Sequence, residues 1–433
     1  MATVAEDRPA VRSGTRPSAP PGPSYPRFAQ GMRMLLTEHR MLERYRRRYG
    51  DVFAIEVWPF EPLVVVADPA EVKRIFTGDP ATLHAGEGNS VLGPLVGPHS
   101  VLLLDEKEHL RRRKVLLPPF HGERMRVYGD VMRDLAEREV ATWPAGEPFA
   151  VLPAMQRVTL RIILRTVFGL EEGARMDQLE RALLDLLART QVMMLPSLQR
   201  NLGPWSPWAK FLRSREAVDT ILFDEIARRR AGAGDGEDIL SLLLSTDATD
   251  AELRDDLMTL LVAGHETTAT TMAWTVERLV RHPEAQARAA EDGDYLDAAV
   301  KESQRVRPVL TYAMRKLTQP MEVGGYEAPA GATLGTSVTL MHRRPDLYPE
   351  PYAFRPERFV GVRPDTYGWI PFGGGVRRCL GAAFAQYEMR QVLGTMLERC
   401  VLRPHDPEPE RHQRKMITFV PAKGATVLVE RRA

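Results

Sequence analysis

The sequence predicts a mainly helical protein that also carries small β-sheets. Apolar residues recur at helical spacing through most of residues 126–230, and a strongly apolar helix is expected from residue 249 to residue 281. Short alternating runs bounded by turn residues, as in residues 52–66, instead predict strands. A chain of 433 residues can form one large domain or two to three ordinary ones.

Composition narrows the class of protein. Apolar residues make up 44% and charged residues 27%, which is typical of a soluble globular protein, and a net charge of +2 gives no global reason to expect nucleic acid binding. The 2 cysteines, Cys379 and Cys400, exclude a disulfide framework and a four-thiolate metal site. Because the sequence has no apolar run of about 18 residues and no apolar signal core, we expect a cytoplasmic protein without a membrane span.

The N-terminal region divides into short segments. Residues 1–27, rich in Pro, Ser, Arg and Gly, predict a disordered tail. A helix is expected over residues 30–49, a β-hairpin over residues 52–66, and a further helix directly after Asp68. Residues 85–98 are rich in Gly, Pro and Ser and predict a long loop, which in a compact domain is often functional.

A basic stretch follows this loop. His109 and Arg113 are four residues apart and would share one face of a helix. Most charge runs of this kind are solvated faces, so a binding role and a plain basic surface both stay open at this point.

The long apolar helix contains a polar interruption. It is expected to begin with a capping box, in which Thr249 caps the helix and Glu252 reaches back. The polar stretch from Gly264 to Thr268 lies in its apolar middle, where polar groups are costly to bury unless they are satisfied or used. The stretch is either a polar rung bonded to neighbouring helices or an acid–alcohol pair, Glu266 and Thr267, that faces a cavity and passes protons.

Weaker patterns follow in the C-terminal half. Glu302 and Arg305 lie three residues apart on an expected helix, where an ordinary surface ion pair is the common interpretation. Residues 321–338 predict short strands with glycine turns, and residues 416–430 alternate like a hairpin around Lys423.

A glycine-rich loop leads into a cysteine between Phe372 and Gly381. Glycine lets a backbone approach a flat or bulky ligand closely. Cys379 comes just before an expected helix over residues 382–398, and the positive end of the helix dipole favours the thiolate. Such a thiolate could be a nucleophile, a redox sensor or a metal ligand, whereas an isolated cysteine is more often buried and inert.

The order of these motifs is similar to that of one family. A His/Arg helix, A-G-x-E-T-T, E-x-x-R, P-E-R-F and F-x-x-G-x-R-x-C-x-G follow one another between about residues 25 and 430. The chain therefore resembles the cytochrome P-450 superfamily of haem-thiolate monooxygenases, of the soluble bacterial type. The resemblance implies that residues 28–433 form a single domain of the cytochrome P-450 fold, with haem b between the long distal helix and the helix after the cysteine loop.

The resemblance also implies roles for residues around the haem. Cys379 corresponds to the thiolate ligand of the iron, where an electron-rich sulfur favours O–O cleavage. The residues that correspond to partners of the haem propionates are His109, Arg113, Arg315 and Arg377. The implied cofactor-binding residues are His109, Arg113, Ala263, Gly264, Arg315, Phe372, Gly373, Arg377, Cys379 and Gly381.

Two further groups of residues follow from the resemblance. Glu266 and Thr267 correspond to the catalytic pair that delivers protons to dioxygen, and Glu302, Arg305 and Arg358 to a buried structural triad. The implied activity is insertion of one oxygen atom from O2 into a C–H bond of a lipophilic small molecule, by hydroxylation or epoxidation. The implied lining of the substrate site is residues 85–101, Met193, Met194, Ala263, residues 309–312 and residues 416–418.

Electrons are expected to come from outside this chain. The resemblance implies a ferredoxin and a ferredoxin reductase as partners, with NAD(P)H acting only indirectly, and we expect the protein itself to be a monomer. An acidic ferredoxin would be steered by Arg111, Arg112, Lys114 and Arg378. Two alternatives keep the haem, namely a peroxide-driven peroxygenase and a non-catalytic protein that binds haem and ligand. The intact acid–alcohol pair argues against both.

Overall fold

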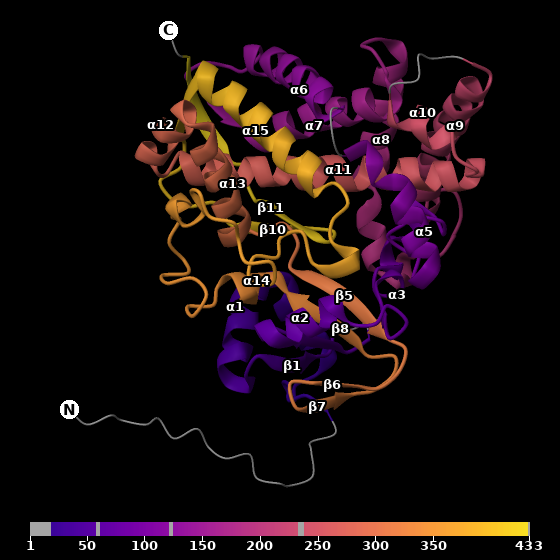
Figure 1. The fold of residues 1–433 in the computed structure, drawn as a ribbon, viewed down its shortest axis with the longest axis vertical. Coiled ribbons are helices and arrows are strands. Elements are labelled where there is room, and N and C mark those ends of the chain that lie inside the picture. The colour runs from indigo at the N-terminus through magenta and orange to yellow at the C-terminus, as the bar shows by residue number, and fades with distance from the viewer. Residues whose placement is uncertain (1–18, 58–60, 121–123, 233–237, 432–433) are drawn as a thin grey trace.

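The computed structural model describes residues 19–57, 61–120, 124–232 and 238–431. Helices make up the larger part of the molecule (Figure 1). The helices are α1 (Arg27–Tyr49), α2 (Pro69–Thr77), α3 (Ala85–Gly88), α4 (Gly93–Val96), α5 (Glu106–Leu116), α6 (Arg124–Ala141), α7 (Val151–Phe168), α8 (Ala174–Ala188), α9 (Pro207–Arg230), α10 (Ile239–Leu244), α11 (Asp250–Leu279), α12 (Pro283–Glu291), α13 (Gly293–Val306), α14 (Val338–His342) and α15 (Ala382–Arg399).

The strands form small sheets. They are β1 (Val52–Ile55), β2 (Leu63–Val66), β3 (Leu83–His84), β4 (Pro148–Ala150), β5 (Tyr312–Leu317), β6 (Met321–Val323), β7 (Tyr326–Ala328), β8 (Thr333–Ser337), β9 (Cys400–Pro404), β10 (His412–Lys415), β11 (Thr418–Pro421) and β12 (Thr426–Arg431). One sheet has the order β1-β2-β8-β5-β3, another β4-β12-β9, and β6–β7 and β10–β11 each pair alone. The strands β1, β5, β6, β7 and β8 lie together at the end opposite the C-terminus, with β10 and β11 near the middle (Figure 1). The antiparallel register of Val52 with Val66 confirms the first predicted hairpin.

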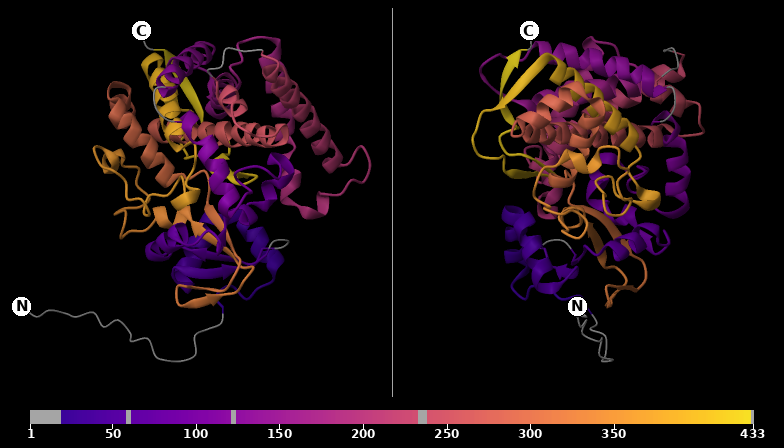
Figure 2. Two further views of the ribbon diagram at one scale, coloured as in Figure 1. Left: turned by 45° about the vertical axis from the view of Figure 1, so that its right-hand side comes forward. Right: turned by 60° about the vertical axis from the view of Figure 1, so that its left-hand side comes forward.

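Helix α11 crosses the middle of the molecule. Its N-terminus carries the predicted capping box, because the Glu252 amide donates to the Thr249 hydroxyl at 3.3 Å and the Thr249 amide donates to the Glu252 carboxylate at 2.9 Å. Helix α7 packs along it, with α6 and α15 on the same side and the hairpin β10–β11 on the other (Figure 1). Most of α11 is buried, and Figure 2 shows the helical part of the molecule, through which it runs, from two further sides.

Two sequence predictions about this fold need correction. Residues 416–430 are not one hairpin, because β11 pairs with β10 whereas β12 pairs with β4 and β9. The expected loop at residues 85–98 contains the short helices α3 and α4. The prediction of a disordered tail over residues 1–27 falls mostly outside the described residues and stays a prediction; in the described part, the Pro21 carbonyl accepts a hydrogen bond of 2.8 Å from the Ala54 amide on β1.

The described helices are not suited to crossing a membrane. None of those helices combines the length and the low charge that crossing a bilayer requires. The long apolar helix α11 is no exception, since it carries several charged residues in its first turns, among them Glu252 and Arg254.

Candidate functional site

The middle of α11 is its accessible part. Ala263 is exposed, and Gly264, Glu266 and Thr267 are partly exposed, whereas the helix is buried from Thr268 to Val276. The Thr267 hydroxyl donates a hydrogen bond of 2.8 Å to the carbonyl of Ala263, one turn back. A Cβ atom at Gly264 would lie 2.4 Å from the Ile163 side chain, so the absence of a side chain there lets α11 approach α7 closely. An acid and an alcohol are thus adjacent where this helix opens.

The carboxylate of Glu266 is held at both oxygens. Oε2 accepts a hydrogen bond of 2.9 Å from the Gln156 amide on α7, and Oε1 lies 3.0 Å from the Lys415 ammonium on β10. His265 is buried, and its burial lowers the pKa of the imidazole. The ring Nδ1 of His265 lies 2.9 Å from the Leu261 carbonyl, which anchors this neutral side chain to its own helix.

The cysteine loop is closed by its own backbone and by α2. The Cys379 amide donates a hydrogen bond of 2.9 Å to the Phe372 carbonyl. Gly375 has a φ of +64°, and a Cβ atom there would lie 1.7 Å from the carbonyl oxygen of Phe76. Only glycine therefore fits this position, for a reason that lies in α2 rather than in a bound ligand. No atom lies within 4 Å of the Cβ position of Gly381, directly before α15.

The Cys379 side chain is exposed, and yet burial within the surrounding protein raises the pKa of its thiol. The two observations agree if the sulfur faces an internal hollow. A hydrogen bond from the Gly381 backbone and the charges of Arg113 and Arg378 lower the pKa but do not outweigh burial. Burial therefore opposes the thiolate that the start of α15 favours, and a coordinated metal ion would deprotonate the thiol.

Four basic side chains, His109, Arg113, Arg315 and Arg377, gather near this loop and are called the cation cluster here. Burial and the charges of Arg377 and Arg113 lower the pKa of His109 to about 4. Burial and the charge of Arg377 lower the pKa of Arg315 to about 10. Burial and the neighbouring arginines therefore both make positive charge costly in this cluster.

Among the described residues, Asp105 is the carboxylate that forms an ion pair with the cation cluster. Arg377 pairs with Asp105 and also donates to the carbonyls of Val101, at 3.2 Å, and Leu104. Within the described residues, neither Arg113 nor Arg315 forms an ion pair, and the Arg315 side chain donates to the carbonyl of the preceding Met314 at 2.7 Å. Buried cations without acidic partners favour an anionic ligand.

These residues fit the expected haem. The cation cluster can neutralise two carboxylates, the exposed Cys379 supplies a soft ligand for iron, and the positions of Ala263 and Gly381 are open. The structure thus brings together most of the predicted cofactor residues at the cysteine loop and α5, and it places Glu266 and Thr267 on the accessible part of α11.

Glu302, Arg305 and Arg358 form a second charged group, called the Glu302 network here. The two oxygens of Glu302 each accept a hydrogen bond of 2.7 Å from Arg305, and both side chains are fully buried. Arg305 also donates to three backbone carbonyls, and Arg358 lies 3.4 Å from Glu302. The predicted triad is therefore present, and the interpretation as a surface ion pair is wrong.

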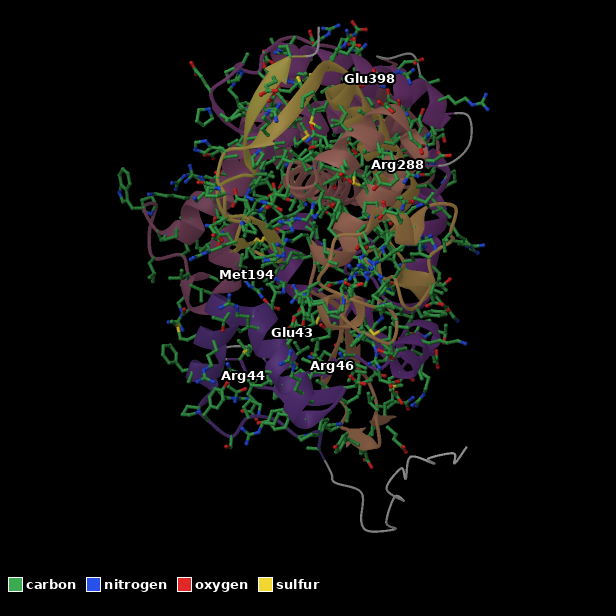
Figure 3. The ribbon with its side chains drawn as sticks, turned by 90° about the vertical axis from the view of Figure 1, so that its left-hand side faces the viewer. Glu43, Arg44, Arg46, Met194, Arg288 and Glu398 are labelled. Atoms are coloured by element: carbon green, nitrogen blue, oxygen red, sulfur yellow. The ribbon has the colours of Figure 1, made fainter. Side chains whose placement is uncertain are left out.

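Two of the segments expected to line a substrate site, residues 309–312 and 416–418, lie side by side. The Phe419 amide donates to the Val309 carbonyl at 2.9 Å, and Leu310 forms an isolated bridge with Thr418. Met193 is buried and Met194 is partly exposed. Figure 3 shows Met194 at mid-height, between Arg288 above and Glu43 below.

The structure corrects one predicted surface residue and adds three site residues. Arg112 is buried and pairs with the buried Asp256 of α11, so it is not available to a partner protein. Sequence reasoning missed Gln156, Lys415 and Asp105, because each meets its partner across more than a hundred residues of chain. No pattern in the neighbouring sequence marks any of these three side chains as part of the site.

Comparisons with known proteins agree with the arrangement. A family model described as cytochrome P450 matches residues 20–429. A Mycobacterium bovis protein named cytochrome P450 135B1 is 39% identical over 95% of this chain and 91% of its own length, and one from Mycobacterium tuberculosis named cytochrome P450 135A1 is 40% identical over 94% of each. The solved structure titled retinoic acid bound cyanobacterial CYP120A1 has a TM-score of 0.83 and 21% identity, over 96% of this chain and 100% of that one.

Proposed function

This chain belongs to the cytochrome P450 family of monooxygenases, and from that premise we propose that it inserts one oxygen atom from O2 into a C–H bond of a lipophilic small molecule. The observation that carries this proposal is the acid–alcohol pair. Glu266 and Thr267 stand on the accessible part of an otherwise buried helix. The family as a whole implies a haem-thiolate cofactor, O2 and a substrate.

The cofactor proposed here is haem b. Cys379 would ligate the iron, and the cation cluster would bind the two propionates by charge-assisted hydrogen bonds. Phe372, Gly373 and Gly381 belong to the proposed contacts of the cysteine loop. Ala263 and Gly264 would face the cofactor from α11, although the Cβ position of Gly264 points toward α7.

The side chains of this chain have defined tasks in the proposed reaction. When bound, haem supplies the oxidising chemistry that activates dioxygen. Glu266 would receive protons from solvent and pass them toward Thr267, whose hydroxyl is fixed by its bond to the Ala263 carbonyl. The apolar lining would hold the substrate and exclude water from the reacting carbon.

A lipophilic substrate is favoured by the residues near this pair. Leu310, Met416 and Ile417 are partly exposed and apolar, and methionine adapts to irregular shapes. The structural relative titled as bound to retinoic acid holds a lipophilic carboxylic acid, which agrees with this class. Fatty acids, terpenoids and steroids are the compounds to test first.

Electrons are proposed to come from a ferredoxin and its reductase. Arg111, Lys114 and Arg378 are exposed, although Arg111 is already paired with Glu108 and Glu252. Because exposed charges steer association, turnover supported by an acidic ferredoxin should fall as ionic strength rises. A rate that is independent of ionic strength would count against this docking surface.

The central test is the absorption spectrum of the reduced protein with carbon monoxide. We expect a thiolate-type band in the wild type and its loss in Cys379→Ala, together with loss of all turnover. A Cys379→Ala protein that kept this band would refute the assignment of the ligand. Titration of lauric acid, geraniol and progesterone against the haem band of the wild type would then identify the substrate class.

Turnover assays separate the monooxygenase from the alternatives. Product formed with ferredoxin, reductase and O2 supports the proposal, whereas product formed only with added peroxide supports a peroxygenase. Binding without product in either assay supports a non-catalytic protein. In Thr267→Ala, consumption of reduced cofactor should continue while product per electron pair falls.

A further inference from the structure

Three elements meet at the carboxylate of Glu266. Gln156 reaches it from α7 and Lys415 from β10, and Glu266 itself stands on α11. Since each partner takes a different oxygen, the carboxylate cannot turn without losing one contact. Its orientation therefore depends on where α7 and β10 lie.

The two partners differ in strength and exposure. Gln156 offers a neutral amide, whereas Lys415 offers an ammonium with a side chain that is 40% exposed, beside a Glu266 side chain that is only 14% exposed. The neighbouring Arg414 is paired with Glu38, and His265 is kept neutral by burial, with its Nε2 3.9 Å from Glu266. Among the described residues, Lys415 is thus the cation that holds Glu266, and it also reaches solvent.

Lys415 occupies a particular place in its hairpin. It ends β10, and the next residue, Met416, has a φ of +55° and begins the turn toward β11. The far side of this turn is bonded to the segment before β5, through Leu310 with Thr418 and Val309 with Phe419. A molecule that contacts Met416 therefore contacts the residue next to Lys415, and one that contacts Leu310 contacts a segment that is bonded to the same turn.

We propose that Lys415 is a positioning residue that fixes the Glu266 carboxylate beside Thr267 and so links proton delivery to the seating of a substrate against the hairpin β10–β11. The inference deepens the proposed monooxygenase function and rests on it. When a substrate packs against the hairpin, the ion pair with Lys415 holds the Glu266 carboxylate in place. Without Lys415, Glu266 keeps only the hydrogen bond from Gln156, and its side chain can rotate away from Thr267. Protons are then no longer passed from Glu266 toward Thr267, and reduced cofactor is consumed without formation of product.

The experiment compares three variants of the full-length, haem-loaded protein. Lys415→Met removes the ammonium and keeps the length of the side chain, and Lys415→Arg restores a cation. Lys423→Met is the matched control, because Lys423 lies in the turn that follows β11 and pairs with Asp406 at 2.8 Å, away from Glu266. The probe is whichever of lauric acid, geraniol and progesterone shifts the haem band most.

The first readout is coupling between reduced cofactor and product. We expect product per electron pair to fall at least about threefold in Lys415→Met, to recover in Lys415→Arg and to stay unchanged in Lys423→Met, while the dissociation constant of the probe changes less than about twofold. Unchanged coupling in Lys415→Met overturns the proposal. So does a failure of Lys415→Arg to recover, or a loss of affinity parallel to the loss of coupling, since the latter marks a substrate contact.

The second readout does not depend on activity. Loss of an ion pair between partly buried groups should speed amide hydrogen exchange in residues 416–418 by about threefold in Lys415→Met but not in Lys423→Met. Equal exchange in the wild type and Lys415→Met overturns the link between Lys415 and the hairpin. If the wild type forms no product with any probe, the proposed function fails instead, and hydrogen exchange alone decides the role of Lys415.

Discussion

The Glu302 network and the cation cluster are both buried and charged, but their partners differ. In the Glu302 network, both oxygens of Glu302 and the whole guanidinium fork of Arg305 are bonded within the protein. In the cation cluster, Asp105 is the acidic partner of Arg377, while Arg113 and Arg315 have none among the described residues. Charges satisfied inside the protein hold its structure, whereas charges that lack partners indicate where a ligand of opposite charge binds.

The largest expected effect comes from breaking the satisfied region. Glu302→Gln would leave Arg305 as a buried charge without a counterion, and should lower the free energy of unfolding by about 3–5 kcal/mol. Unfolding in urea measures this value. The matched control is Glu350→Gln, which breaks the exposed pair with Arg355 and should cost less than about 1 kcal/mol. Equal costs in the two variants would show that burial does not distinguish these pairs.

The second prediction addresses the region without partners. Arg315→Met removes one of several buried cations that repel each other, so the unfolding free energy of the haem-free protein should change by less than about 1 kcal/mol. Haem affinity should fall about tenfold to a hundredfold, as expected for a lost charge-assisted hydrogen bond. Haem titration followed by absorbance measures this affinity. Strong destabilisation with unchanged haem affinity would assign Arg315 to structure instead.

A third charged region, the pair of Arg112 with Asp256, is only partly hydrogen-bonded within the protein, and we expect the smallest change per pH unit in unfolding free energy there. Arg112 pairs with Asp256, but Oδ1 of Asp256 and Nε of Arg112 have no hydrogen-bond partner. Burial raises the pKa of Asp256 to about 7, so the folded state binds more protons than the unfolded state from about pH 4 to pH 7. The stability that this group contributes is therefore present at low pH and is lost as pH rises toward 7.

The measurement is the unfolding free energy of the wild type and Asp256→Asn from pH 5 to pH 8. The wild type should lose about 1 kcal/mol per pH unit below pH 7 relative to Asp256→Asn, because the amide cannot titrate. Parallel pH profiles for the two proteins would show that the carboxyl of Asp256 is already ionised throughout this range.

The comparison also explains how far the sequence could predict this site. Local spacing was sufficient for the capping box of α11 and for the first hairpin. It also predicted that Glu302 and Arg305 pair, but not that the pair is buried, which followed only from the family resemblance. The cysteine loop also has a local motif, but the need for glycine at positions 374 and 375 comes from Phe76 of α2, about 300 residues away in the chain.

The remaining features depend on long-range pairing. The alternation over residues 416–430 predicted strands there but could not show that β12 pairs with β4 and β9 rather than with β11. Arg112 resembles its exposed neighbours in sequence, and only Asp256, 144 residues away, makes it a buried partner. The same holds for Lys415 and Glu266, whose separation of 149 residues hides the pair from any local pattern.

The bond between Thr267 and the Ala263 carbonyl has a consequence for small molecules near α11. A hydroxyl has a single hydrogen, and here that hydrogen is committed to the backbone, so toward the open side Thr267 offers only lone pairs. Water and alcohols can donate to these lone pairs, whereas carbon monoxide and ketones cannot. While this bond holds, Thr267 can accept a hydrogen bond from a neighbouring donor, and it can pass its own hydrogen on only when the bond to the Ala263 carbonyl breaks.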